Sequence, residues 1–338
     1  MTAEHEPQRV RFARSVPHVS ADRSYTPVMP SDADDLAFRE SVFAWLRAQM
    51  LVTDSFTRDE LSHFTFNGRP HRLVGPQTGI WRVKELSDGA ISMVTAYVPE
   101  GRKRPYDDSV GADGLLRYKW RGDNPHLADN VWLRTAMQRG LPLVWFIGIG
   151  YRPGTTTQVF RPEFPVWLID EEPHLQQFVV AVEEGQRTIP ANADAAVIDI
   201  TKRYNERTVR VRHHQPLFRS VVLHAYERRC AVCRLPFAEL LDAAHIRPDS
   251  QDGDARVSNG LSLCKIHHGA FDANIIGISP DYVVHVRDSV LKTFDGPTLQ
   301  HSIKEMDGER LRQLPRSRAE MPDRDLLAER FDVFRQAS

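Results

Sequence analysis

Cysteine and histidine residues are concentrated in one short stretch of this 338-residue chain. The three cysteines are Cys230, Cys233 and Cys264, and His267 follows three residues after the last of them. Two short-spaced pairs of ligands joined by a longer segment are the sequence form of a tetrahedral zinc site. Thiolate and imidazole suit a borderline-soft ion, and four protein ligands leave no position for water. We therefore predict a structural Zn²⁺; the simpler alternative is three cysteines that pack as small apolar side chains.

Three more polar residues are interleaved with these ligands. His245 ends a strand-like segment, Asn259 precedes Gly260, and His268 directly follows the last predicted zinc ligand. Taken singly, a histidine is more often a surface or structural residue, and an asparagine before glycine is more often part of a turn. The informative feature is that all three stand in this order within residues 245–268.

The order and spacing of these residues resemble those of the HNH endonucleases, which have the ββα-metal fold. The motifs that carry the resemblance are CAVC (230–233), AHI (244–246), NGLSLC (259–264) and KIHHGAFD (265–272). The resemblance implies that His245 is the general base. It further implies that Asn259 orients this histidine or its loop, and that His268 binds a catalytic divalent cation.

The same residue types suit the hydrolysis of a phosphodiester. This reaction needs an activated water molecule and a positive charge near the departing oxygen, and a histidine beside a hard cation supplies both. Asp272 lies four residues after His268, so the two would share one face of a helix. Mg²⁺ or Mn²⁺ would fit such an oxygen-rich site. The alternative for Asp272 is a solvated carboxylate.

One position departs from the pattern of the resembled family. Its members often carry a metal-binding Asp or His immediately before the general base, where this chain has Ala244. Asp242 would point to the same strand face as position 244, because side chains alternate along a strand. We therefore consider Asp242 as a substitute ligand of the catalytic cation.

The sequence before this segment predicts an α+β chain of two domains. Helical spacing begins near Asp32, and a second helix is predicted over 129–140, with Asp129 as its N-cap and Gly140 closing it. Strand patterns occur at 90–98, 115–122, 141–150, 164–169 and 178–183. We predict a flexible arm at 1–30, a target-recognition domain with a mixed or antiparallel sheet at 31–185, a linker with one short helix at 186–212, and a nuclease domain at 213–338 that ends in an amphipathic helix at 324–336.

Basic and aromatic residues alternate in one predicted strand of the first domain. Arg117, Lys119 and Arg121 would share one face, with Tyr118 and Trp120 on the other. Such a pattern suits contact with phosphates and stacking on bases; the alternative is a solvated face over a packed aromatic face. The candidate DNA-binding residues, including two from RKRPYDD (102–108), are Arg104, Tyr106, Arg117, Lys119, Trp120 and Arg121.

The whole arrangement resembles the McrA-like restriction enzymes, which attack modified DNA with an N-terminal recognition domain and a C-terminal HNH module. The resemblance implies double-stranded, modified DNA as the substrate, and in some members a pocket for an extruded base. Candidate wall residues of such a pocket are Trp81, Tyr97, Tyr106, Tyr118 and Trp120. The strand content fits a PUA- or SRA-like barrel, although no motif specific to either is present.

Two other functions stay open at this level. One is a DNA-binding protein that does not cleave and uses the zinc module as a scaffold; the other is a sequence-specific HNH nicking or mobile-element nuclease. A homodimer would allow two single-site modules to cut both strands. The helix at 324–336 could form its interface, but we expect the helix to pack on its own domain.

Composition sets the remaining expectations. The formal net charge is −1, so any basic surface must be local. No apolar segment approaches the roughly 20 residues needed to span a membrane, and the N-terminus lacks the apolar core of a signal peptide. The odd number of cysteines argues against a disulfide framework. We expect a cytoplasmic protein without a membrane partner.

Overall fold

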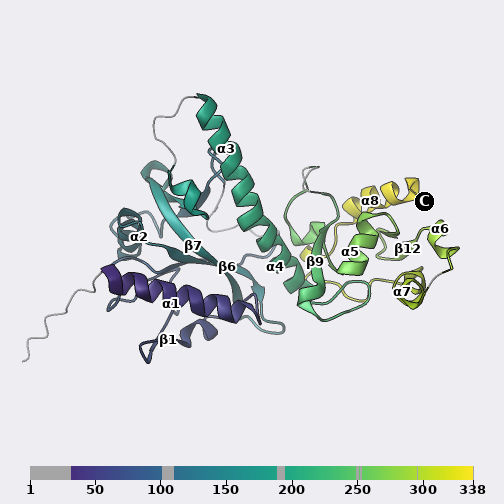
Figure 1. Ribbon diagram of the computed structural model, residues 1–338, viewed down its shortest axis with the longest axis horizontal. Coiled ribbons are helices and arrows are strands. Elements are labelled where there is room, and N and C mark those ends of the chain that lie inside the picture. The colour runs from purple at the N-terminus through teal and green to yellow at the C-terminus, as the bar shows by residue number, and fades with distance from the viewer. Residues whose placement is uncertain are drawn as a thin grey trace, which may run out of the picture.

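The computed structural model describes residues 32–100, 110–188, 195–248, 251, 253–294 and 296–337, and of 188 and 195–200 only the backbone. The predicted arm at 1–30 and the candidates Arg104 and Tyr106 lie outside the described residues. Two modules follow one another along the chain, and a long helical segment runs between them (Figure 1). No helix among the described residues combines the length and apolar character needed to cross a membrane.

A mixed sheet forms the centre of the N-terminal module. Its strands are β3 (Ile80–Trp81), β4 (Ser92–Thr95), β5 (Leu116–Lys119), β6 (Leu143–Tyr151), β7 (Gln158–Glu172) and β8 (Gln177–Ala181). The order is β3-β4-β6-β7-β8-β5, and the β4–β6 pair is parallel whereas the other pairs are antiparallel. The Tyr118 hydroxyl on β5 donates to the Val94 carbonyl on β4, 3.2 Å away, so the sheet curls. The described strands leave the ladder open between β3 and β5, so a closed PUA- or SRA-like barrel is not confirmed.

The apolar run of β6 explains the position of the core. Trp145 and Ile147 belong to the apolar cluster on one face of the sheet, and Val144 and Phe146 to the cluster on the other. A strand buried on both faces needs such a continuous apolar sequence. Helix α1 (Asp32–Met50) contributes to the second cluster and α2 (Ala128–Gln138) to the first, so these two helices cover opposite faces of the sheet.

The start of α2 corrects one sequence prediction. Asp129 is not the N-cap, which is Leu127; it lies inside the first turn. Its buried carboxylate forms an ion pair with Arg121, and its negative charge near the helix N-terminus is favourable. Gly140 follows the helix with a φ of +61°, as predicted for the residue that closes it.

The predicted linker at 186–212 is mostly helical. Helix α3 (Ala195–Val209) has 15 residues and continues through a π-helical turn, η4 (Arg210–His214), into α4 (Gln215–Ala225). The expected short helix is therefore part of a longer helical segment that enters the second module (Figure 1). Helix α4 packs on β6 of the first module and on the first two strands of the second.

The second module begins with two strands and a helix. Strands β9 (Leu241–His245) and β10 (Gly260–Cys264) are antiparallel, and helix α5 (Lys265–Asp272) follows β10 directly. A hairpin of β11 (Ile276–Ile278) and β12 (Val284–Val286) comes next, followed by α6 (Asp288–Leu291), α7 (Pro297–Ser302) and α8 (Arg324–Gln336). This order agrees with the predicted ββα arrangement around the HNH motifs.

The C-terminal helix occupies the predicted range. The Asp323 carboxylate caps α8 by accepting hydrogen bonds from the backbone N–H groups of Asp325 and Leu326. Leu327 and Phe334 are buried, and α8 packs on β11. The apolar face of this helix therefore covers its own module, as expected.

Short elements complete the chain. A hairpin of β1 (Phe64–Phe66) and β2 (Arg69–His71) lies beside α1. Short helical turns are η1 (Glu60–Ser62), η2 (Pro173–Leu175), η3 (Glu184–Thr188), η5 (Ala238–Leu240), η7 (Val257–Asn259), η8 (Lys304–Met306) and η9 (Arg318–Glu320).

Candidate functional site

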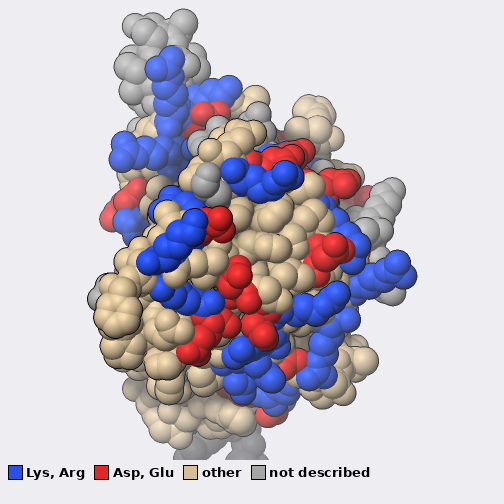
Figure 2. All heavy atoms as spheres, turned by 90° about the vertical axis from the view of Figure 1, so that its right-hand side faces the viewer, with Lys and Arg blue, Asp and Glu red and all other residues tan. Residues whose placement is uncertain are grey.

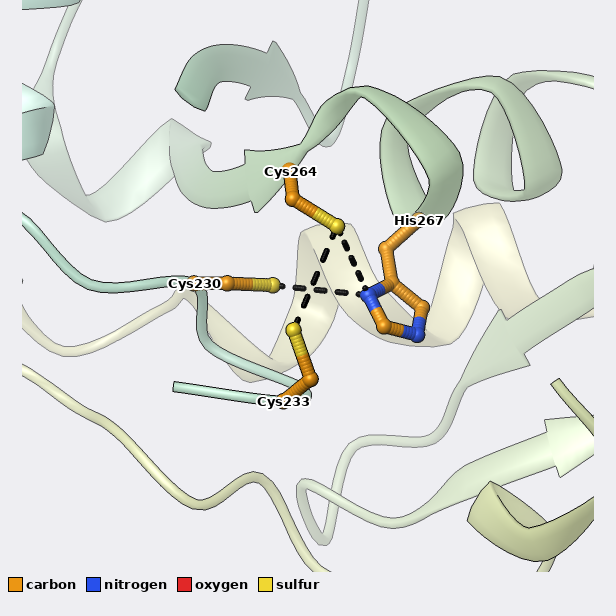
Figure 3. A group of neighbouring side chains, drawn as sticks. All are labelled: Cys230, Cys233, Cys264 and His267. Carbon is orange, nitrogen blue, oxygen red and sulfur yellow. Dashed lines mark hydrogen bonds between the residues drawn. The ribbon is translucent and has the colours of Figure 1, made fainter. Parts of the chain in front are cut away.

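The structure brings the four predicted metal ligands together. Cys230 and Cys233 lie in the turn after α4, Cys264 ends β10, and His267 lies in the first turn of α5. Their ligand atoms all lie within 4.8 Å of one another and point to a common centre (Figure 3). The Nδ1 atom of His267 is 3.1 Å from the Cys264 sulfur and 3.5 Å from the Cys230 sulfur.

These separations fit a four-coordinate metal ion. Metal–sulfur bonds of about 2.3 Å and metal–nitrogen bonds of about 2.0 Å place the ligand atoms of a tetrahedron about 3.5–3.8 Å apart. The sulfur atoms of Cys233 and Cys264 are 4.0 Å apart, close to this range. The other ring nitrogen of His267 lies 2.7 Å from the Ser302 carbonyl oxygen, to which it donates when protonated. This hydrogen bond leaves Nδ1 as the ligand atom.

The protonation chemistry of the cluster also suits a metal. Burial lowers the pKa of the His267 imidazole, but hydrogen bonds with Cys233 and Cys264 raise it to about 10. In the absence of an ion, a proton therefore occupies the position that a cation would take. Metal binding must displace protons from such a site, which makes its metal affinity increase with pH.

His245 and Asn259 are joined by backbone and side-chain contacts. His245 is the last residue of β9 and pairs with Gly260 on β10. The Asn259 side chain is fully buried; its Oδ1 accepts from Arg247 N at 2.8 Å and its Nδ2 donates to Arg247 O at 3.1 Å. The Asn259 carbonyl accepts from Ile246 N at 2.9 Å. Asn259 therefore holds the loop that follows His245.

His268 lies between two carboxylates. Its Nδ1 atom is 3.2 Å from an oxygen of Asp242 on β9, and its Nε2 atom is 3.3 Å from an oxygen of Asp272 on the same helix. The structure thus brings together the three candidate ligands of the catalytic cation, with the two carboxylates on opposite sides of the ring. An imidazole offers one nitrogen to a metal while the other donates a hydrogen bond.

Lys265 is a neighbour that the sequence did not indicate. Its ammonium group contacts both oxygens of Asp242, at 2.6 and 2.7 Å. Burial raises the pKa of Asp242, but the hydrogen bonds from Lys265 and His268 lower it overall. Asp242 is therefore held as a carboxylate. No spacing rule reveals this ion pair, because the lysine is on α5 and the aspartate on β9.

A cavity of about 880 Å³ lies where the two modules meet. Its walls include the candidate residues Tyr97, Tyr118, Lys119, Trp120 and Arg121. The second module contributes η7, the turn that ends at Asn259, and residues next to η9. The volume is within the usual range of ligand pockets.

Two candidate residues, Arg117 for DNA binding and Trp81 for the pocket wall, do not line this cavity. Arg117 is only 5% exposed, and its guanidinium group is held by carboxylates of Asp113 and Glu172. The charge of Arg117 is therefore already neutralised inside the module, and its contact with DNA stays a prediction. Trp81 is not part of the cavity wall, and its indole N–H donates to the Arg72 carbonyl.

Direct contacts bridge the modules around the cavity. The Glu100 carboxylate accepts from the backbone N–H of Val257 at 2.7 Å, and the Tyr97 hydroxyl donates to Glu320. On the side of α4, Arg228 forms an ion pair with Asp54. The Glu100 contact reaches a residue only two positions before Asn259, so it links the first module to the candidate site.

The surface at the nuclease end carries charges of both signs. Figure 2 shows basic and acidic side chains intermingled there, without a field of one sign. This agrees with the net charge of −1. Affinity for DNA would therefore depend on local groups of basic residues, as the composition predicts.

Comparison with known proteins identifies the class of the second module. Residues 230–279 match a family model described as "HNH endonuclease", and this segment contains every predicted zinc-binding and HNH residue. The segment is an HNH endonuclease domain, and the chain that carries it is a nuclease.

Two solved structures are similar to larger parts of the chain. The "Modification dependent TagI restriction endonuclease" is 18% identical, with 76% of this chain and 85% of that chain covered and a TM-score of 0.26. The "Type IV phosphorothioation-dependent restriction endonuclease ScoMcrA" is 13% identical, with 76% of this chain and 53% of that chain covered and a TM-score of 0.21. No curated protein matches the chain.

Proposed function

We propose that the protein is a metal-dependent DNA endonuclease that cuts modified foreign DNA, with His245 as its general base. The observation that carries the proposal is the local geometry of the HNH domain. Asn259 fixes the loop after His245, and His268 lies against two carboxylates on the neighbouring strand and helix. His245 ends strand β9, which also carries Asp242.

The proposed reaction begins with a water molecule at His245. A neutral imidazole accepts a proton from this water near neutral pH, and the resulting hydroxide attacks the phosphorus atom. The P–O bond to the leaving sugar oxygen breaks, and this oxygen takes up a proton. A bound Mg²⁺ or Mn²⁺ would neutralise the charge that develops on the phosphate and on the leaving oxygen.

We assign the catalytic cation to Nε2 of His268 and to Asp272. Asp242 faces the other ring nitrogen and already holds Lys265 with both oxygens, which suits it to orient the imidazole. The Asp272 side chain is 64% exposed and has an oxygen available for a hydrated ion. Cys230, Cys233, Cys264 and His267 would hold a structural Zn²⁺ that stabilises the small module.

The first module would choose the target. The cavity between the modules combines aromatic walls with the basic residues Lys119 and Arg121, which suits a planar base attached to a phosphate. We infer that Tyr97, Tyr118 and Trp120 contact the modified base there. The chain alone would then recognise the modification and cut nearby.

A cleavage assay tests both parts of this proposal. Wild type and His245→Ala would be given unmodified, cytosine-methylated, hydroxymethylated and phosphorothioated DNA with Mg²⁺ or Mn²⁺. We expect one modified substrate to be cut, and the variant to be slower by about 10²–10⁴-fold, the usual contribution of a general base. Zinc content and DNA binding should not change.

Other outcomes separate the alternatives. Equal cutting of all four substrates would keep the nuclease and remove the dependence on modification. Cutting of unmodified DNA at one defined site would indicate a sequence-specific nicking enzyme. Tight binding without cleavage in either metal would indicate a DNA-binding protein, and an active His245→Ala would refute the assignment of the base.

A further inference from the structure

An aromatic ring from the long helical segment lies flat against His245. The rings of Phe218 and His245 are stacked, with centroids 3.9 Å apart and an angle of 17° between their planes. Phe218 belongs to α4, far from the HNH motifs in the sequence, and is only 3% exposed. One face of the imidazole is therefore covered by a buried hydrocarbon ring.

The strand next to His245 is shaped to admit this ring. Gly260 is the residue opposite His245 on β10. A Cβ atom at Gly260 would lie 2.4 Å from Val222 Cγ2 and 3.1 Å from Phe218 Cζ. The φ angle of Gly260 is −125°, which any residue can adopt, so the glycine serves a close approach and not a turn. Because Gly260 has no side chain, Phe218 and Val222 of α4 can pack directly against the backbone beside His245.

The imidazole of a general base needs a defined plane as well as a defined position. The last side-chain torsion of histidine is broad and roughly two-fold, so the backbone alone does not fix the ring. Asn259 fixes the main chain after His245, whereas the contact with Phe218 restricts rotation of the ring. A misplacement of about 1 Å in a catalytic geometry can reduce a rate by about 10²-fold.

We propose that Phe218 is a positioning residue, which holds the imidazole plane of His245 in the orientation that accepts a proton from water. The proposal rests on the proposed role of His245 as the general base. Helix α4 would then position His245 as well as join the two modules. Leu217 and Val221 on this helix line the interdomain cavity, while Phe218 and Val222 on the adjacent stripe contact the strands of the candidate active site.

Steady-state cleavage by the full-length protein tests this role. In Phe218→Leu we expect kcat to fall by about 10–100-fold, while KM and DNA affinity stay within about two-fold. Phe334→Leu is the matched control, because it makes the same change at a buried site in the same module that packs beside Gly277. This control should keep kcat within about two-fold of wild type.

A second variant separates orientation from packing. Phe218→Met nearly conserves the buried volume but has no planar face, and swaps of this kind cost little stability. A positioning role predicts that Phe218→Met is slow like Phe218→Leu, at unchanged zinc content and melting temperature. If the methionine variant cleaves at the wild-type rate, or if Phe334→Leu loses as much activity as Phe218→Leu, the proposal is wrong.

A double variant shows whether the effect passes through His245. Phe218→Leu should not lower the residual rate of His245→Ala any further, because the ring that it positions is gone. A full additional loss in the double variant would refute the proposal. Failure of the general-base assignment gives a different result, because His245→Ala itself would then cleave normally.

Discussion

At the scale of single residues, His267 decides whether the cysteine cluster can hold a metal. Its Nε2 atom is committed to the Ser302 carbonyl at 2.7 Å, and its Nδ1 atom faces the thiols of Cys230 and Cys264. The hydrogen bond to Ser302 therefore fixes the orientation of the imidazole before any ion binds. Such a contact fixes the orientation of a metal ligand.

The cluster leads to a prediction about metal content. In Cys264→Ser we expect about one equivalent of zinc to be lost, because a hydroxyl is a poor substitute for a thiolate ligand. The module should then unfold or melt at a much lower temperature, since a structural metal contributes directly to folding. Elemental analysis and thermal denaturation measure both effects.

Asp272→Asn is the comparison for this experiment. It should retain the zinc and the melting temperature, but it should need a higher concentration of Mg²⁺ or Mn²⁺ for cleavage. Equal zinc loss in both variants would contradict the assignment of two separate metal sites. Retention of zinc in Cys264→Ser would exclude this cysteine as a ligand.

Residues that are close in the sequence were the ones that could be predicted. The cluster of four ligands could be predicted, and the roles of His245, Asn259 and His268 could be proposed, because these motifs lie close together in the sequence. Phe218 could not be found, since its contact with His245 depends on how α4 packs on β9 and β10. The ion pair of Arg117 with Glu172 could not be predicted for the same reason, because Glu172 lies 55 residues further along the chain.

At the scale of elements, the helical segment α3–η4–α4 joins the two modules. Its middle is a π-helical turn over Arg210–His214. A π turn contains an additional residue relative to an α-helix and occurs often at functional sites. The face that α4 presents to β6 and to β9 therefore depends on this turn.

Deletion of both Val211 and Arg212 tests this dependence. Loss of one residue should close the π turn to an α-helix, and loss of the second should rotate α4 by about 100° relative to α3, since an α-helix has 3.6 residues per turn. Phe218 would then no longer face His245, and Leu217 and Val221 would no longer face the cavity. We expect cleavage to fall by at least about 10-fold, while helix content and zinc stoichiometry are retained.

Arg212→Ala is the control for the deletion. It removes an exposed side chain that pairs with Glu183, without changing the length of the helix. Pairs of this kind contribute about 0–1 kcal/mol, so this variant should cleave like wild type. If the deletion variant is fully active, the phase of the helical segment is not important for function.

The elements show where sequence patterns were sufficient and where they were not. The buried strand β6 and the helix α8 were predicted because a continuous apolar run and an amphipathic run are strong local signals. The sequence predicts a linker over 186–212, because most of its residues are charged or polar. The few residues by which α3 contacts the first module do not form a recognisable apolar pattern. Asn205, for example, is buried and donates to the carbonyl of Asp113.

At the scale of the whole molecule, carboxylate groups of both modules take part in the contacts between them. Tyr97 donates to Glu320, and Glu100 accepts from the backbone of Val257. Burial raises the pKa of Glu320, the hydrogen bond from Tyr97 lowers it in part, and the charge of Glu100 raises it again. The protonated form of Glu320 is thus favoured in the folded protein.

This shift gives the interface a pH dependence of known sign. The folded state holds the proton of Glu320 more tightly than the unfolded state does, so the contribution of Glu320 to stability is most favourable at acid pH. This contribution decreases as the pH rises from about 4.5, the ordinary pKa of a glutamate, to the raised pKa of Glu320. At higher pH it is constant. At neutral pH the carboxylate therefore destabilises the contact between the modules.

The corresponding prediction concerns Glu320→Gln. The amide keeps an oxygen that can accept from Tyr97 but carries no charge, so we expect the melting temperature to rise by about 1–3 °C at pH 8 and to change little at pH 4.5. Glu239→Gln is the control, because it removes the same charge from an exposed position of the second module. Calorimetry of both variants across this pH range measures the difference. An equal change in both would mean that net charge, and not the contact between the modules, is responsible.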